Sequence, residues 1–224
     1  MQDFFHIPKS WSDPVPSLSR TVILTAIVLF IESLLILTRN QIPRITAITL
    51  LTALRGLDVL ILAVFGPWSL KSAFTSKTVK DSLIITLTLS LAGILCLMGL
   101  KKVMGSSFLG SGKGIDNPSQ LILILFYITA CLLSPIAEEL LFRGLFFRKM
   151  REKWNFRVCT FSVSCLFALL HLLFKGHAMA ALMSFTGSLL FCLGYEKTKF
   201  ILTPILLHIS GNLIIYLSPY IFIV

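Results

Sequence analysis

The chain has 224 residues, of which 56% are apolar and 13% are charged, and its mean hydropathy is +0.89. This composition is far more apolar than that of a soluble domain, so it indicates an integral membrane protein. The net charge of +10 comes from basic residues spread over short loops between apolar runs. Such a distribution argues against a nucleic-acid-binding face and favours retention of the loops on the cytoplasmic side.

Runs of about 20 apolar residues follow one another, and each is long enough for a helix to cross a hydrocarbon core of about 30 Å. The sequence lacks the strand-like alternation over about 10 residues that a membrane barrel needs. It therefore predicts an all-α, polytopic transmembrane helical bundle of about seven to eight helices. The expected spans are 21–38, 45–65, 82–100, 120–150, 157–174, 178–195 and 200–218.

One membrane domain accounts for the whole chain, with its chemistry in the C-terminal half. Residues 1–117 are expected to form about three spans and a loop, and the tail at 1–18 lacks the pattern of a cleavable signal. Residues 118–218 are expected to form the catalytic core, in which Pro135 should kink the fourth span or separate a short second helix. Twelve Lys and Arg residues fall on one side of the spans and six on the other, which predicts a cytoplasmic N-terminus.

All five cysteines fall inside apolar segments, and no CxxC pair occurs. This pattern predicts small buried hydrophobic residues rather than disulfides or metal ligands. The residues are Cys96, Cys131, Cys159, Cys165 and Cys192.

Two adjacent carboxylates and an arginine stand in a segment that is otherwise almost pure hydrocarbon. Glu138 and Glu139 are about 100° apart on a helix, so they cannot point at the same spot. Glu139 and Arg143 are at i and i+4, which predicts a buried structural ion pair. Glu138 is then left without a local partner. A carboxylate in a low-dielectric cavity binds protons more tightly than in water, so Glu138 is a candidate to deprotonate a water molecule.

Two later spans supply matching polar groups. The fifth span carries His171 among leucines and phenylalanines, and the seventh carries His208 and Asn212 on one face at i and i+4. Glu138 with His171 could hold and deprotonate a water molecule. His208 and Asn212 could donate hydrogen bonds to the oxyanion of a tetrahedral intermediate. The combination predicts a peptide-bond hydrolase.

Each of these groups also has a structural interpretation. A lone buried histidine is more often a hydrogen-bonded structural residue, a Glu–Arg pair can lock two helices together, and Asn212 can bridge helices. Glu32 and Asp58 are expected to form a structural network with Arg55. We assign no role to His6 or His177.

The motifs Glu138-Glu139-x-x-x-Arg143, Phe167-x-x-x-His171 and His208-x-x-x-Asn212 lie in this order on successive late spans, with Pro135 before them and Gly144 after the arginine. Together they resemble the CPBP family, which holds the CAAX-prenyl proteases of the second type and their bacteriocin-processing relatives. The resemblance covers roughly residues 118–215. It implies an intramembrane endopeptidase fold of about eight helices. It also implies that Glu138 acts as general base together with His171, and that His208 and Asn212 are the oxyanion donors. Glu139, Arg143 and Phe167 are expected to be structural supports of this site.

The resemblance leaves cofactor and substrate open. We expect a metal-free glutamate mechanism without a cofactor. Zinc held by Glu138, His171 and His208 is the alternative. The expected partners are the lipid bilayer and a protein or peptide with a hydrophobic or lipidated segment, in a prokaryotic plasma membrane. Two competing hypotheses are a non-catalytic scaffold or immunity-type protein that binds a peptide in the same cavity, and a small proton-coupled transporter.

Overall fold

A computed structural model of the protein describes residues 15–38, 42–66, 76–104, 119–176 and 178–221. All regular structure in these residues is helical. Each of the seven expected spans coincides with a helix, which confirms the predicted all-α bundle. The helices are α1 (Leu18–Thr38), α2 (Arg44–Phe65), α4 (Ser76–Met104), the continuous series α5 (Gln120–Ile128), η3 (Thr129–Leu133), α6 (Ser134–Glu139), η4 (Leu140–Phe147) and α7 (Arg148–Arg151), and then α8 (Phe156–Lys175), α9 (Ala178–Thr198) and α10 (Leu202–Ile221).

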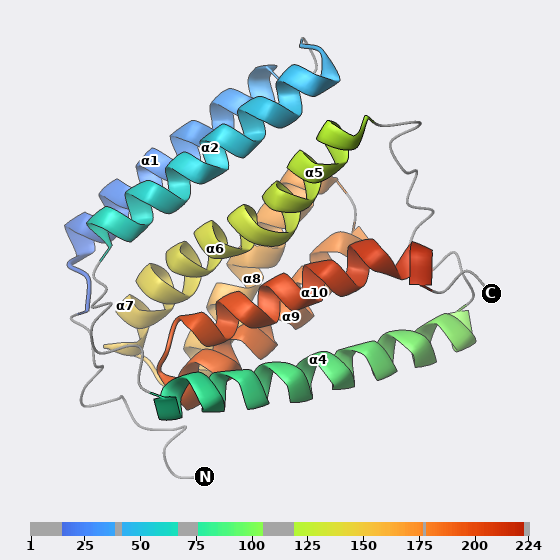
Figure 1. Ribbon diagram of the computed structural model, residues 1–224. Helices are drawn as coiled ribbons and strands as arrows, with labels where there is room; N and C mark the ends of the chain where they lie inside the picture. The colour runs from blue at the N-terminus through green and yellow to red at the C-terminus, as the bar shows by residue number, and fades with distance from the viewer. Residues whose placement is uncertain (1–14, 39–41, 67–75, 105–118, 177, 222–224) are drawn as a thin grey trace.

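The helices of the C-terminal half form the centre of the bundle (Figure 1). The long series from α5 to α7 packs against α8 and α10, while α9 lies between α8 and α10. The α1–α2 pair covers the long series on one side, and α4 packs on α10 and α9 on the other. The helices before residue 118 therefore flank the core instead of forming a separate unit.

The surface of the bundle is that of a membrane protein. Four of the described helices are long and apolar enough to span a bilayer: Arg44–Phe65, Gln120–Arg151, Phe156–Phe174 and Ala178–Thr198. Shorter apolar helices occur at Leu18–Ile31 and Leu202–Leu217. Many large hydrophobic side chains point outward while several charged ones are buried, which is the reverse of a soluble protein. The chain is an integral, multi-pass membrane protein.

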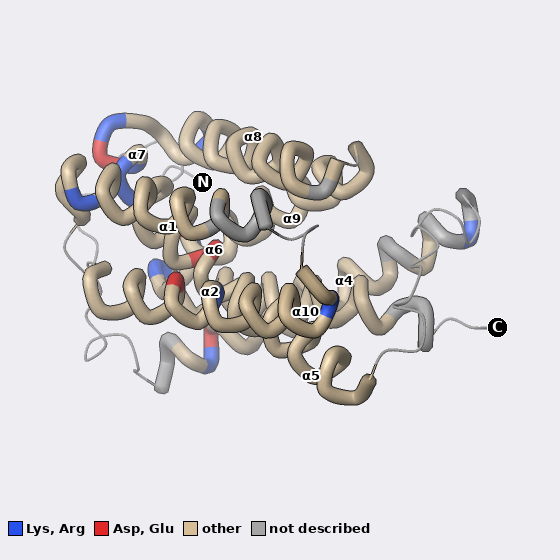
Figure 2. Tube along the Cα trace, turned by 90° about the horizontal axis from the view of Figure 1, so that it is seen from above, with Lys and Arg blue, Asp and Glu red and all other residues tan. Residues whose placement is uncertain are grey.

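Charged residues are distributed unevenly along the bundle. Figure 2 shows basic residues gathered at the end near α7, and acidic residues of α2 and α6 within the bundle. An ionised carboxylate at membrane depth costs free energy unless it is paired or in contact with water. The acidic residues within the bundle are therefore candidates for a functional site.

The sequence predicts that Pro135 either kinks the fourth span or separates a short second helix. The structure shows no separate helix in this span. The helix runs without interruption from Gln120 to Arg151. Its backbone instead widens into a π-helical turn at Thr129–Leu133, where the amide of Ser134 donates to the carbonyl of Thr129. A proline lacks an amide donor and crowds the preceding turn, and a π turn is one way in which a helix accommodates it.

Close approach of three helices depends on Gly194 of α9. A Cβ atom added there would lie 2.8 Å from a methyl carbon of Leu207 and 3.2 Å from one of Thr203, both on α10. The hydroxyls of Thr203 and Ser82 are 2.7 Å apart, which joins α10 to α4 at the same level. The absence of a side chain at Gly194 therefore allows α10 to approach α9.

The prediction for the cysteines is wrong in one case. Cys131, Cys159 and Cys192 are buried, but Cys165 of α8 is exposed. An apolar sequence context does not tell which face of a membrane helix meets lipid, because both faces are apolar. The side chain of Cys96 lies outside the described residues.

Candidate active site

The predicted pair of Glu139 and Arg143 is present and completely buried. An Oε1 to Nη1 distance of 2.8 Å joins the two side chains, and both have an exposed fraction of 0%. The second terminal nitrogen of Arg143 donates to the hydroxyl and the carbonyl oxygen of Ser188 on α9. This arrangement ties the glutamate-bearing helix to α9 and gives the buried guanidinium both an anion and neutral acceptors.

The imidazole of His208 lies between the two glutamates. Its Nδ1 is 2.8 Å from Oε1 of Glu139, and its Nε2 is 3.8 Å from Oε2 of Glu138. Because Glu139 is paired with Arg143, its carboxylate acts as the acceptor and Nδ1 as the donor. Glu139 is thus more than a structural partner of Arg143, since it also fixes the orientation of a predicted active-site histidine.

His171 reaches the same glutamate from α8. Its Nδ1 is 3.0 Å from the carbonyl oxygen of Phe167, and its Nε2 is 4.0 Å from Oε2 of Glu138. A carbonyl oxygen can only accept, so Nδ1 carries the hydrogen. In a neutral ring, Nε2 is then an acceptor directed at the glutamate.

Glu138 is partly exposed, at 17% of its side chain, and its two oxygens face different groups. Oε2 faces His171 and His208, whereas Oε1 lies 3.9 Å from Nη2 of Arg55 on α2. The sequence leaves Glu138 without a local partner, and the groups that face it in the structure come from α2, α8 and α10. Arg55 also lies 3.7 Å from Asp58, so the predicted Arg55–Asp58 pair is present.

Asn212 is one turn beyond His208 on α10. Its amide nitrogen donates to the carbonyl oxygen of Ala130 in the π-helical turn at 2.8 Å. The structure therefore shows a bridge between two helices, as in the structural interpretation of this residue. An amide group has two donor hydrogens, so this bond does not use the donor capacity of Asn212 completely.

Aromatic rings enclose the charged groups. The ring of Phe167 is 4.4 Å from that of His171 and 5.8 Å from that of His208. Phe191 of α9 stacks on His208 at 4.7 Å, and the guanidinium carbon of Arg143 lies 5.1 Å from the ring centres of both phenylalanines. These contacts hold both imidazoles and the guanidinium in place, with cation–π attraction adding to the ion pair.

Sequence reasoning missed two of these contacts. Ser188 and Phe191 lie at i and i+3 in the sixth span and face the buried arginine, but nothing distinguishes them in an apolar segment. The side chain of Glu32 lies outside the described residues, so its place in a network with Arg55 stays a prediction. His6 and His177, to which we assigned no role, also lie outside them.

The atoms proposed as zinc ligands face one another, with Oε2 of Glu138 opposite Nε2 of His171 and of His208. Within the described ranges, no group of three or more His, Cys, Asp or Glu side chains has a metal-binding arrangement. Both Nε2 atoms are 3.8–4.0 Å from Oε2 of Glu138, whereas three ligands about 2.0–2.2 Å from one zinc ion lie closer to one another. We therefore derive no step through a metal, and zinc stays an untested prediction.

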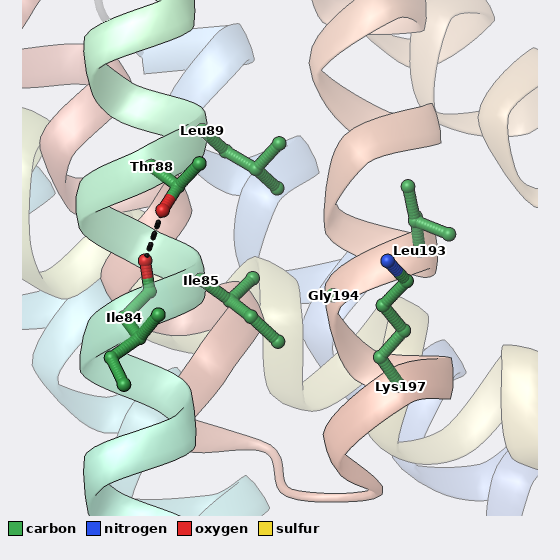
Figure 3. Close-up of a pocket in the computed structure, with 7 residues that line it drawn as sticks. All are labelled: Ile84, Ile85, Thr88, Leu89, Leu193, Gly194 and Lys197. Carbon is green, nitrogen blue, oxygen red and sulfur yellow. Dashed lines mark hydrogen bonds between the residues drawn. The ribbon is translucent and has the colours of Figure 1, made fainter.

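A cavity of about 140 Å³ lies elsewhere, between α4 and α9. Figure 3 shows side chains of both helices around it, and the hydroxyl of Thr88 donates to the carbonyl of Ile84 on the same helix at 2.8 Å. None of the predicted site residues is in its lining, which consists of Ile84, Ile85, Thr88, Leu89, Leu193, Gly194 and Lys197. The convergent glutamate and histidines, and not this cavity, are the candidate active site.

Comparisons with known proteins find similarity to membrane peptidases. Residues 120–214 match the family described as Rce1-like, type II CAAX prenyl endopeptidase. The chain is also 28% identical over 141 residues to a Bacillus subtilis (strain 168) protein named "Putative membrane peptidase YdiL". That alignment covers 59% of this chain and 56% of the relative, so the chain matches little more than half of the relative's length. No solved structure matches the chain.

Proposed function

We propose that this chain, whose residues 120–214 match the Rce1-like CAAX endopeptidase family, is an intramembrane endopeptidase. It hydrolyses a peptide bond close to a hydrophobic or lipidated segment of a protein or peptide substrate. One observation carries the proposal: Oε2 of Glu138 faces the Nε2 atoms of His171 and His208, which come from two other helices of an apolar bundle.

The proposed reaction begins with a water molecule between Glu138 and His171. A separation of 4.0 Å is too long for a direct hydrogen bond but suits two acceptors bridged by one water. Glu138 takes a proton from this water as its oxygen attacks the substrate carbonyl, and a tetrahedral oxyanion forms. When the C–N bond breaks, Glu138 returns the proton to the leaving amine.

His208 and Asn212 are the proposed oxyanion donors. Because Nδ1 of His208 donates to Glu139, Nε2 can donate as well only when the ring is doubly protonated. Glu139 supplies the negative charge that such a ring needs as a neighbour. The second amide hydrogen of Asn212 is the other donor, while its first is bound to Ala130. Preorganised donors of this kind act where the negative charge develops.

Replacement of Glu138 by glutamine tests the proposal. The change keeps the shape of the side chain but removes the base, so cleavage should fall by at least about 10²-fold, while the protein still folds and inserts. Glu152→Gln is the matched control, since Glu152 pairs with Lys149 outside the site and is partly exposed. Mass spectrometry of membrane peptides from cells with either variant or the unchanged protein would identify substrates. Full cleavage by the Glu138→Gln protein contradicts the proposal.

The proposed mechanism is metal-free. Cleavage should continue in the presence of 1,10-phenanthroline. If cleavage is lost and added zinc restores it, the zinc alternative is supported instead.

The proposed location is a prokaryotic plasma membrane, with the N-terminus in the cytoplasm. The many bases near α7 favour a cytoplasmic position for that end of the bundle. A cysteine placed at Lys153 should therefore react with an impermeant maleimide in inverted vesicles but not in intact cells.

A further inference from the structure

Arg55 brings a positive charge to the candidate site from a helix outside the matched family region. It lies on α2, whereas the family match begins at residue 120. Its guanidinium is 3.9 Å from Oε1 of Glu138 and 3.7 Å from Oδ2 of Asp58. The arginine side chain is 16% exposed and Asp58 is completely buried. An arginine so placed touches the carboxylate on which the proposed reaction depends.

The contacts of Glu138 divide its two oxygens between two tasks. Oε1 faces Arg55, while Oε2 faces both imidazoles. Rotation of the carboxylate by half a turn would exchange the oxygens, but any smaller rotation moves Oε2 away from the histidines. A cation on the Oε1 side opposes such rotation, because the attraction weakens as the oxygen leaves. It also offsets the cost of keeping a carboxylate charged inside hydrocarbon.

The arginine is itself held in place by its own helix. Asp58 lies at i+3, and its Oδ2 is 3.7 Å from Nη1 of Arg55. One turn in the other direction, the hydroxyls of Thr52 and Thr129 are 2.6 Å apart and join α2 to the helix that carries Glu138. The spacing 52, 55, 58 therefore puts a packing contact, a cation and its counter-ion on one face of α2.

We propose that Arg55 is a positioning residue that orients the carboxylate of Glu138 toward His171 and His208. This inference rests on the proposed function. A purely structural Arg55–Asp58 pair would need no contact with Glu138. The geometry gives the arginine two carboxylates from different helices, and one of them is the proposed base.

The decisive variant is Arg55→Gln with Asp58→Asn. Removal of Arg55 alone would take away the cation 3.7 Å from the buried Asp58, whereas the double change removes both charges together. We expect this protein to fold and insert, with kcat lowered about 10- to 100-fold and KM within about 2-fold of its original value. Arg55→Lys keeps the charge without the planar fork, so its loss of kcat should be smaller.

Thr52→Val is the matched control, because it removes a packing contact of α2 without changing a charge. Its kcat should equal that of the unchanged protein, even if its melting temperature falls. All variants are compared with Glu138→Gln as purified, reconstituted full-length proteins with one peptide substrate.

The outcomes separate this inference from the proposed function. If the unchanged protein cleaves, Glu138→Gln does not, and the double variant has an unchanged kcat, the positioning role of Arg55 is wrong while the proposed function stands. Loss of folding in both the double variant and Arg55→Lys would make Arg55 a structural residue and also overturn the inference. Cleavage that is equal in all the proteins would refute the proposed function itself.

Discussion

Glu139→Gln is the variant whose consequences the structure defines best. The change removes the anion 2.8 Å from Arg143, a guanidinium with an exposed fraction of 0%. Ser188 remains as a neutral acceptor, but it does not balance the charge. Breaking one side of a buried ion pair costs about 3–5 kcal/mol of unfolding free energy. A loss of this size is a large part of the about 5–15 kcal/mol that stabilises most proteins.

The same substitution should lower activity through His208. Nδ1 of this histidine donates to the oxygen that Arg143 also binds. A neutral glutamine amide can rotate its nitrogen toward the ring, so neither the orientation of His208 nor its proton is then fixed. Removal of one oxyanion donor typically costs about 10²–10³-fold in kcat, so a misoriented His208 should lower kcat by up to this factor. We therefore expect both stability and kcat to fall.

Glu196→Gln is the control that separates the loss of stability from the loss of kcat. Glu196 forms a two-point ion pair with the buried Arg151, at 2.8 and 3.2 Å, near the α7 end of the bundle. Its loss should lower the unfolding free energy in the same way but leave kcat unchanged. Unfolding in mixed micelles and cleavage of a peptide substrate would be measured for both variants. A Glu139→Gln protein within about 1 kcal/mol of the original stability would refute the reasoning on the buried pair.

Two further predictions concern packing around the site. Gly194→Ala should lower the melting temperature, because its methyl group would lie 2.8 Å from Leu207 and overpacking costs about 1–3 kcal/mol; the matched change Gly56→Ala, with no atom within 4 Å, should not. Ser188→Ala removes a hydrogen bond to a buried charge and should destabilise by about 1.5–3 kcal/mol in the same unfolding assay. An unchanged stability of Ser188→Ala would show that Arg143 does not depend on this hydroxyl.

Local spacing made much of this molecule predictable. The helices follow from apolar runs of membrane length, which leave few alternatives in a bilayer. The Glu139–Arg143 pair follows from i, i+4 geometry on one helix, and it is present in the structure. The Arg55–Asp58 pair at i, i+3 is present for the same reason. The division into residues 1–117 and 118–218 stays a prediction, as do the catalytic roles.

Contacts between helices could not be predicted from the sequence. The rotation of a membrane helix about its axis and its depth in the bilayer leave no local sequence pattern. No local spacing relates His171 of α8 to Glu138 of α6, yet Nε2 of His171 lies 4.0 Å from Oε2 of Glu138. The contact between Arg55 and Glu138 joins residues 83 positions apart in sequence, and only the packing of α2 against α6 brings them together. Prediction of such a pair requires the relative rotation of two helices.

The π-helical turn before the glutamates explains why Asn212 bonds to Ala130. In this turn the amide of Ser134 is bound to Thr129, so Ala130 has lost its usual donor four residues ahead. Its donor five residues ahead would be Pro135, which has no amide hydrogen. The carbonyl of Ala130 is therefore open to a side chain, and Asn212 donates to it at 2.8 Å. Pro135 thus leaves open the acceptor that orients Asn212, one turn from the histidine that faces both glutamates.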